Sequence, residues 1–452
     1  MEYGWETELF ALATPVGGKK MNNCAVVIPC ADTDEMLLQH LKRLEAQGCK
    51  EFDVLLISQR KPNVESKVNM LFFRENYPMG SSGGFGVGQV LGYTLGYDYV
   101  MNADVDALPL SNNLIGTLKQ TAEREQKLTF PLFISNDTGK MDKAGSGNPN
   151  QYGTCTRRLF EGEGFEYFRL FKGSEDMEFM ERLSMKGMIF LERSAQIGHK
   201  SHVFDSIQLL KSRGNKSIYY KKSEVIASML FARHCILRGR PLPAFRYIMR
   251  AWSACVKTQL FHSQYPDIHR PVMEAMRLNM DGVSPFRTSE IKEEKFGAGS
   301  RTLQLFSGGN SKEGIIFPEK DDPHRMGEKG IIGYLGIAAR LLKIAFSRAD
   351  YLLPDSRFLD QYASLLNILL LLKPVKYSDG KIYSSGLSVF QVAANFAATL
   401  LLAPLFLLVI LLAVFVKAGE IDYPITTKNV KKNLAGFLAY VKKLDEASKQ
   451  KN

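Results

Sequence analysis

Asp104 and Asp106 stand one residue apart, directly after a short apolar run that ends at Met101. Two carboxylates at this spacing can share one divalent cation, or bind it directly and through water. Mg²⁺ or Mn²⁺ held in this way keeps free positions for the oxygens of a diphosphate, and it would stabilise charge on a departing nucleotide diphosphate. An Asp-x-Asp sequence also occurs in solvated turns. Its place after a predicted buried strand is what favours the metal site.

A second acidic pair, Glu175 and Asp176, opens a predicted helix over residues 174–186 with Ser174 as its N-cap. Acids are common in a first turn simply because they complement the helix dipole. The functional alternative is a general base that accepts the proton of an attacking hydroxyl.

His199 and His202 follow a predicted strand, Met188–Leu191, and are three residues apart in an expected loop. Either one could add a ligand to a metal that carboxylates already hold. A lone histidine is more often an ordinary hydrogen-bonded residue, so the interest of this pair depends on the two aspartates.

Glycines recur over residues 81–88, ahead of a predicted helix at 89–97. Such a segment permits positive φ angles and a close approach of backbone to ligand, which predicts a ligand-binding loop; the alternative is a flexible surface turn. A dinucleotide fingerprint needs Gly-x-Gly-x-x-Gly after the first strand. The spacing here is Gly84-x-Gly86-x-Gly88, which excludes a Rossmann dehydrogenase, and there is no Walker A motif.

The elements that must position these residues alternate between strand and helix over the first 110 residues. Buried strands are predicted at 24–29, 52–57, 71–73 and 98–101, with a helix at 35–47. This alternation predicts an α/β fold with a mainly parallel mixed sheet flanked by helices. Ligands bind at the carboxyl ends of strands in such sheets, which is where Asp104 and Asp106 stand.

Charge and cysteine content limit the classes of binding partner and the compartment that we expect. The 452-residue chain has a net charge of +11, which suits an anionic partner such as a phosphorylated substrate or an anionic lipid. Its lysines and arginines are spread along the chain rather than gathered with aromatics, so we expect no nucleic-acid partner. Six scattered cysteines predict buried thiols in a reducing compartment. The N-terminus shows no secretory signal, which places the bulk of the chain in the cytoplasm.

Residues 382–416 carry no charge, and this segment is long enough to span a bilayer. A buried core helix is the alternative, and Pro404 suggests a kink or a re-entrant hairpin. Beyond it, Val430, Leu434 and Leu438 recur at helical spacing among lysines, which predicts a basic amphipathic tail on an anionic membrane.

The predicted organisation has four parts. Residues 1–20 form a leader and residues 21–240 the catalytic domain. Residues 241–350 form a helical extension on the acceptor side, and residues 351–452 a C-terminal, helical, membrane-associated region.

Taken in order, these features resemble the inverting family 2 glycosyltransferases of the GT-A fold, from about Cys24 to about Ile226. The likeness rests on the opening strand that ends at Pro29, the glycine-rich segment, the two acidic pairs, the histidine after the next strand, Arg182 with Gly187, and Tyr219-Tyr220.

The resemblance implies roles for individual residues. Asp104 and Asp106 would hold Mn²⁺ or Mg²⁺ and the donor diphosphate, and Asp176, beside Glu175, would be the catalytic base. His199, by spacing favoured over His202, would complete the metal site. Pro29, Gly83 and Gly84 would contact the donor.

A narrower likeness, to galactofuranosyltransferases and rhamnosyltransferases acting on cell-surface glycans, rests on Gly83-Gly84-Phe85 and on Phe171-Lys172-x-x-Glu175-Asp176. The chain also departs from the family pattern. It has Ile57-Ser58-Gln59-Arg60 where an acidic residue usually follows the second strand, and Lys221-Lys222 where Arg-Asn usually follows the aromatic pair.

Two functions are therefore expected. The first is metal-dependent transfer of a sugar from a nucleotide-diphosphate donor to a lipid-linked or cell-surface glycan acceptor, by a membrane-associated enzyme whose catalytic domain lies on the cytoplasmic face. The alternative is a membrane-tethered nucleotide-sugar-binding protein that has lost catalysis.

Overall fold

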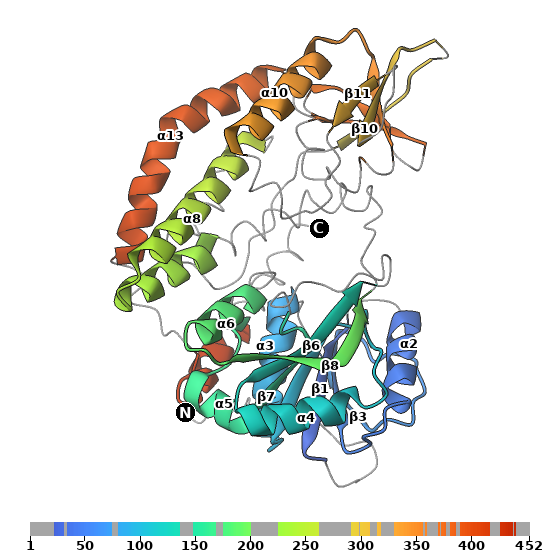
Figure 1. Cartoon of the computed structure of the whole chain (residues 1–452), viewed down its shortest axis with the longest axis vertical. Coiled ribbons are helices and arrows are strands. Elements are labelled where there is room, and N and C mark those ends of the chain that lie inside the picture. Colours follow the sequence, from blue (N-terminus) through green and yellow to red (C-terminus); the bar gives the residue numbers. More distant parts are fainter. Residues whose placement is uncertain are drawn as a thin grey trace.

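The computed structural model describes residues 22–30, 34–74, 80–135, 148–168, 175–199, 225–261, 291–297, 299–307, 314–317, 330–355, 358, 369–370, 372–376, 380–385, 389–415, 425–436 and 438–439 of the chain. The described part contains two β-sheets, an eight-stranded sheet in the N-terminal half and a six-stranded sheet in the C-terminal half. Figure 1 shows the larger sheet with its helices at one end of the molecule, and long helices running from there toward the smaller sheet.

The first four strands of the larger sheet are parallel and are the strands predicted from the sequence. They are β1 (Cys24–Pro29), β2 (Asp53–Ser58), β3 (Met70–Arg74) and β4 (Tyr99–Ala103). β1 lies between β2 and β4 and is almost fully buried. Both of its faces are covered, which explains why it is a continuous apolar run rather than an alternating one.

The other four strands make the sheet mixed. They are β5 (Ala107–Pro109), β6 (Leu128–Ser135), β7 (Gln151–Thr156) and β8 (Ile189–His199), and the full order is β3-β2-β1-β4-β7-β6-β8-β5. β7 runs antiparallel to β4 and β6, and β5 antiparallel to β8. A mainly parallel mixed sheet flanked by helices is therefore confirmed.

Helices cover both faces of this sheet. α2 (Asp34–Glu45) and α4 (Leu114–Glu125) contribute to the core on one face. α3 (Gly80–Thr94), α5 (Arg157–Glu163) and α6 (Glu175–Ser184) contribute to the core on the other. None of the six cysteines, all of which are described, forms a disulfide, and all but Cys49 are buried, as the composition predicted.

The glycine-rich segment is helical, so the predicted loop is wrong. α3 already begins at Gly80, and its glycines let the helix lie directly on its neighbours. A Cβ atom at Gly84 would stand 2.7 Å from Pro29 Cβ, and one at Gly88 would stand 2.2 Å from Val27 Cγ1. These glycines serve close packing of helix on sheet, which a reading of glycine as a loop former misses.

The smaller sheet has the order β11-β10-β12-β13-β14-β9. Its strands are β9 (Ile291–Glu294), β10 (Thr302–Ser307), β11 (Gly314–Phe317), β12 (Tyr351–Pro354), β13 (Val375–Lys376) and β14 (Ile382–Ser385). Helix α10 (Gly330–Phe346) packs on it through Leu341 and Ile344. Pairing of β10 with β12 carries the sheet across residue 350. The helical extension predicted for 241–350 did not anticipate these strands.

The apolar segment predicted at 382–416 begins as strand β14 and continues as one helix, α13 (Val389–Phe415), with Pro404 inside it. A re-entrant hairpin is therefore not formed. Within the described residues, Ala397–Phe415 is the helical stretch long and apolar enough to cross a membrane, with a mean hydropathy of 2.9. α13 packs against α8 (Pro241–Phe261), and Trp252 Nε1 of α8 donates to Ala403 O at 2.7 Å.

The predicted amphipathic tail does form a helical segment, but its apolar side faces protein. Val430 and Leu434 are 6% and 2% exposed, and with Ile425 they belong to the same core as α3 and α6. Phe165 N donates to Ile425 O at 3.0 Å, which ties this segment to the larger sheet's domain. The apolar residues expected to meet a membrane here are used for packing instead.

Candidate active site

Asp104 and Asp106 lie on a tight turn between β4 and β5. Ala107 N donates to Asp104 O at 3.0 Å, which closes the turn, and Asp104 N donates to Asn150 O at 2.7 Å. Asp106 is 9% exposed and Asp104 is half-buried. The two carboxylates are therefore held on one short turn at the end of a parallel strand, as the sequence predicted.

A buried histidine, His40, hydrogen-bonds to the backbone of this turn. His40 Nδ1 lies 2.9 Å from Val105 O, and its Nε2 lies 2.5 Å from the Tyr152 hydroxyl. A carbonyl oxygen can only accept, so Nδ1 carries the proton and Nε2 accepts from the tyrosine. Burial lowers the pKa of His40 to about 4, which keeps the ring neutral at physiological pH. The peptide between the two aspartates is thus fixed.

His199 is the last residue of β8 rather than a loop residue, and its backbone pairs with Ala107, the residue after Asp106. The sheet therefore places His199 one strand away from the acidic turn. His202 lies outside the described residues. Of the two predicted histidines, His199 is therefore the one that the described residues place at this edge.

The chemistry of this turn fits a divalent cation, although no group of three His, Cys, Asp or Glu side chains within ligating distance occurs among the described side chains. The two carboxylates of Asp104 and Asp106 are the hard oxygen donors that Mg²⁺ and Mn²⁺ prefer. Two protein carboxylates are a common complement for such an ion when substrate phosphates and water supply the rest.

The second acidic pair reaches the same edge through a turn at residues 148–150. α6 begins at Glu175, and Asn148 Nδ2 donates to Asp176 Oδ2 at 3.0 Å. Asn150 Nδ2 donates to Glu175 Oε1 at 3.3 Å, while the carbonyl of Asn150 accepts from Asp104 N. Two residues of one turn thus contact both acidic pairs, which are about 70 positions apart in the chain.

Irregular backbone makes this turn possible. The register between β4 and β7 shifts at Asn102 and Ala103, and Tyr152 has a φ of 62° at the resulting bulge. Gly153 N donates to Pro149 O at 3.0 Å, and a Cβ on Gly153 would stand 2.2 Å from that oxygen. A bulge that redirects side chains beside a site is a recurrent feature of functional sheets.

The two carboxyl groups at the start of α6 differ in burial, and therefore in pKa. Burial, with Asp176 as the next cause, raises the pKa of Glu175 to about 8, so this nearly inaccessible carboxyl is mainly protonated at neutral pH. Burial also raises the pKa of Asp176, but hydrogen bonds from Met177 N and Asn148 oppose the rise. Asp176 is half-buried and remains accessible. Of the two, Asp176 is therefore the carboxyl suited to accept a proton.

A third carboxyl lies behind them. Glu166 is fully buried, and its pKa is raised well above the ordinary value by burial first and by Glu175 and Asp176 next. Asn102 Nδ2 donates to Glu166 Oε1 at 3.1 Å and Gln89 Oε1 accepts from Glu166 N at 2.9 Å. The other oxygen of Glu166 has no hydrogen-bond partner among the described residues. A neutral Glu166 avoids a buried charge behind the site.

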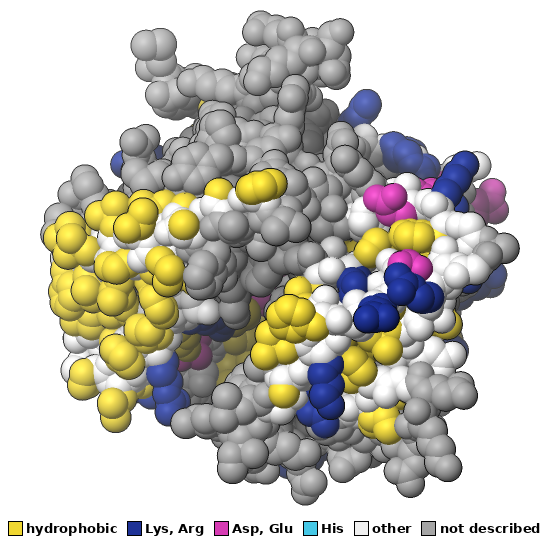
Figure 2. All heavy atoms as spheres, turned by 90° about the horizontal axis from the view of Figure 1, so that it is seen from above, with side chains coloured by type: hydrophobic (Ala, Val, Ile, Leu, Met, Phe, Trp, Pro, Cys, Tyr) yellow, Lys and Arg dark blue, Asp and Glu magenta, His cyan; other side chains and the backbone are white. Residues whose placement is uncertain are grey.

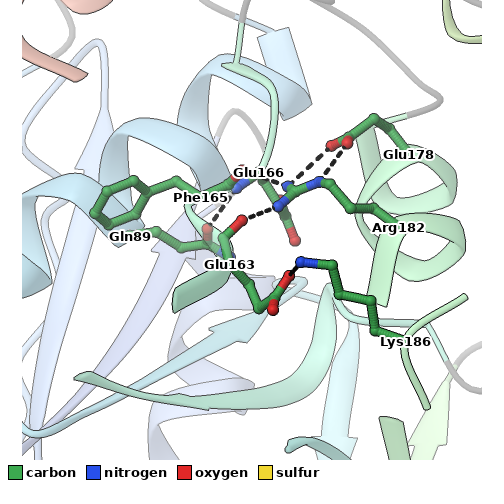
Figure 3. Close-up of polar contacts among 7 residues, drawn as sticks. All are labelled: Gln89, Glu163, Phe165, Glu166, Glu178, Arg182 and Lys186. Atoms are coloured by element: carbon green, nitrogen blue, oxygen red, sulfur yellow. Dashed lines mark hydrogen bonds and ion pairs between the residues drawn. The ribbon is translucent and has the colours of Figure 1, made fainter. Parts of the chain in front are cut away.

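Arg182 anchors α6, the helix that carries Asp176. Its side chain is 2% exposed and pairs at 2.7 Å with the fully buried carboxylate of Glu178, one turn earlier. It also donates to Phe165 O at 2.7 Å and to Glu163 O, while Lys186 pairs with the Glu163 carboxylate. Figure 3 shows these contacts joining α6 to the segment that contains Glu166. The last turn of α6 is thereby held against the end of α5 and the segment that follows it.

Several residues of the site were not singled out from the sequence: Asn102, Asn148, Asn150, Glu166 and His40. The one local signal was Asn148-Pro149-Asn150, which is typical of a turn and says nothing about which residues the turn will meet. Ser174, Phe171, Lys172, Tyr219 and Tyr220 lie outside the described residues.

The structure assigns Asp53 to the fold rather than to the donor. It is fully buried at the start of β2 and accepts from the Tyr97 hydroxyl at 2.9 Å and from Asn69 Nδ2 at 2.8 Å. Arg60, beyond the other end of β2, pairs with Asp34 at 2.8 Å on the surface. Residues 57–60 contain no acid, and Asp53 lies at the other end of β2 and so does not replace the missing one.

We expect Asn148→Ala to lower kcat by about tenfold, because Asp176 loses a hydrogen bond that sets its orientation and favours its ionised form. Steady-state kinetics across pH should also show the acidic limb moving to higher pH. Asn148→Asp, which cannot donate a hydrogen bond when ionised, should not rescue activity. An unchanged kcat and pH profile in Asn148→Ala would contradict this role.

No protein-family model and no curated protein matches the chain. Three similar solved structures are "Crystal structure of S. aureus TarS" (11% identity, TM-score 0.34), "Crystal structure of GalNAc-T7 with UDP, GalNAc and Mn2+" (14%, 0.32) and "Crystal structure of S. aureus TarS 1-349 in complex with UDP" (13%, 0.32). The matches cover 46%, 40% and 47% of this chain, and 39%, 44% and 72% of those chains. The chain thus spans under half the length of the first two. At these identities and TM-scores, function has to be argued from the site itself.

Proposed function

We propose that this chain is an inverting, metal-dependent glycosyltransferase of the GT-A type, moving a sugar from a nucleotide-diphosphate donor to a lipid-linked or cell-surface glycan acceptor. The observation that carries the proposal is the turn of residues 148–150, whose hydrogen bonds join the Asp104 turn to Asp176. These hydrogen bonds hold the Asp104 turn and Asp176 on one edge of the sheet. This supports the proposal, because a single displacement requires the leaving group and the base to be held in a fixed relation.

Asp104 and Asp106 are the residues that would hold Mn²⁺ or Mg²⁺ together with the donor diphosphate, with His199 as a further candidate. When bound, the ion would supply positive charge against the negative charge that develops on the leaving diphosphate. The fixed turn around Val105 keeps the two carboxylates from moving apart as that charge develops.

Asp176 then acts on the acceptor. Its ionised carboxylate takes the proton of the acceptor hydroxyl. The acceptor oxygen forms a bond to the anomeric carbon of the donor sugar as the bond between that carbon and the diphosphate breaks. Attack from the side opposite the diphosphate inverts the anomeric configuration. The protonated carboxyl of Glu175, which accepts a hydrogen bond from the neutral amide of Asn150, carries no charge. Asp176 is then the member of this acidic pair that carries the negative charge.

Pro29 and Gly84 are in contact with each other at the end of β1, and Gly83 is buried beside them in α3. Their predicted contact with the donor remains part of the proposal. It would be made by a helix packed on the strand end rather than by a flexible loop.

The alternative function is a nucleotide-sugar-binding protein without catalysis, which the absence of an acidic residue after β2 motivates. Both acidic pairs are present and positioned by hydrogen bonds, and this favours the enzyme. Detectable turnover of a donor sugar would remove the alternative. The proposal also keeps the enzyme membrane-associated, with the catalytic domain on the cytoplasmic face and α13 as the apolar element.

Donor binding should depend on the acidic turn. With 100-fold excess over Kd, a nucleoside diphosphate or its sugar conjugate adds about 2.7 kcal/mol of stability, so the thermal midpoint of the full chain in mild detergent should rise with Mn²⁺ and not with chelator. Asp104→Ala should lose this shift. Asp98→Ala is the matched control, because Asp98 is exposed at the other end of β4. A nucleotide shift that survives in Asp104→Ala would refute the assignment of the turn.

A further inference from the structure

A corner of the chain, defined here as residues 237–246, joins the helix Val225–Leu237 to α8 and presents large apolar side chains outward. Leu237 is 68% exposed, Leu242 77% and Phe245 61%. A soluble protein rarely leaves three such side chains exposed on one short segment. The corner is therefore a candidate contact surface.

Arginines alternate with these apolar residues. Arg238, Arg240 and Arg246 are exposed in the same corner. The sequence from residue 225 to residue 261 contains no Asp or Glu. A surface that combines exposed leucine and phenylalanine with arginine, and that lacks acids, complements an anionic lipid surface, because the guanidinium groups reach the headgroups while the apolar side chains enter the acyl region.

The outer face of α13 continues this surface. Exposed residues recur there every three or four positions, whereas Phe406, Ile410 and Val414 on the opposite face are buried. The exposed stripe consists of Leu401, Leu405, Leu408, Leu412 and Phe415. Arg233 Nη1, in the helix that leads into the corner, lies 3.4 Å from Phe415 O, so the end of α13 adjoins the corner's own helix. Figure 2 shows hydrophobic side chains gathered on the side where Figure 1 places α13 and α8, with Lys and Arg at the border.

We propose that the corner of residues 237–246, together with the outer stripe of α13, docks the chain on a lipid bilayer that contains anionic lipids. α13 then lies in one leaflet rather than across the bilayer. Its inner face is occupied by α8, which carries Arg246 and Arg250, and a spanning pair would place these charges in hydrocarbon. The bilayer is identified by its chemistry: an apolar layer beneath an anionic surface.

This docking surface is tied to the domain that holds the candidate active site. The helix before the corner contributes Val225, Met229 and Phe231 to the core that also contains α3 and α6. Docking would therefore hold that domain at a fixed place beside the bilayer. The inference concerns membrane binding alone and stands whether or not the chain transfers sugar.

The first test reads out insertion of the corner itself. Leu242→Trp in the full chain, with anionic vesicles after detergent removal, should show a blue-shifted emission that bromine-labelled lipids quench beyond the level of the unmodified chain, which has two tryptophans of its own. Leu110→Trp is the matched control, because Leu110 is 41% exposed directly after β5 and lies outside the proposed docking surface. No added quenching at Leu242→Trp, or equal quenching at both positions, would overturn the proposal.

The second test reads out the charge. In vesicle flotation, the unmodified chain should bind vesicles with anionic lipid more tightly than neutral ones, and Arg238→Glu with Arg240→Glu should weaken that binding by at least about tenfold. Arg193→Glu, exposed on β8, should have no effect. Equal binding to neutral and anionic vesicles, or full retention in the double variant, would overturn the proposal. So would binding to heparin without flotation, which would identify a soluble polyanion as the ligand instead.

Discussion

Asp176→Asn is expected to lower the rate of sugar transfer by about 10²–10⁴-fold while donor binding survives. Asparagine keeps the shape of the side chain but cannot accept a proton from the acceptor hydroxyl. The diphosphate is expected to bind at Asp104 and Asp106, which this change does not touch. Transfer is measured with donor and acceptor at saturation, and donor binding by thermal shift.

Glu175→Gln is the matched control for this variant. Burial raises the pKa of Glu175 to about 8, so the carboxyl is mainly neutral at pH 7 and an amide replaces it with little change in charge. We therefore expect this variant to keep most of the activity. Loss of transfer in Glu175→Gln, with near wild-type turnover in Asp176→Asn, would reverse the assignment of the base.

The pH profile gives the same assignment an independent check. A base must be ionised, so the rate should fall as pH falls through the pKa of Asp176. Burial raises that pKa, which places the acidic limb above the pH at which an ordinary aspartate titrates. The acidic limb should be absent from the residual activity of Asp176→Asn.

Arg182→Met is expected to destabilise the chain by about 3–5 kcal/mol, the cost of leaving a buried charge without its partner. Arg182 is 2% exposed and Glu178 is fully buried, so water cannot replace the lost guanidinium. The change also removes the donors to Phe165 O and Glu163 O. Denaturant unfolding of the full chain gives the shift in midpoint.

Two further variants separate this effect from the loss of any arginine. Arg124→Ala removes an arginine that is 62% exposed and pairs with Glu125, and it should change stability by under about 1 kcal/mol. Combining Arg182→Met with Glu178→Gln should recover part of the loss, because the unpaired charge is gone. A small effect of Arg182→Met, similar to that of Arg124→Ala, would show that α6 is not anchored in this way.

Local sequence determined the strands and the place of the candidate catalytic acids. The runs that form β1, β2 and β4 are buried on both faces, and continuous apolar residues mark such strands without knowledge of their neighbours. An acidic pair directly after a buried strand must stand at the strand's carboxyl end. Asp104 and Asp106 could therefore be placed before the fold was known.

Tertiary structure decided what surrounds those acids. Asn148 and Asn150 meet Asp176, Glu175 and Asp104 only because β7 lies beside β4, an antiparallel insertion that no local pattern specifies. The same holds for His199, whose backbone lies beside the acidic turn through the pairing of β8 with β5. Hydrogen bonds between residues tens of positions apart depend on strand order, and strand order is a property of the whole sheet.

Packing also decided which apolar faces remained exposed. The glycines of α3 predict a loop from the sequence alone, whereas the fold uses them for close contact of a helix with Pro29 and Val27. The tail around Val430 and Leu434 has the periodicity of a membrane-surface helix, yet the domain core takes its apolar side. Periodicity shows that a face must be buried, whereas only the assembled fold shows whether protein or another partner, such as a bilayer, buries it. For the stripe of α13 and the corner of residues 237–246, no protein in the described part of the chain does so.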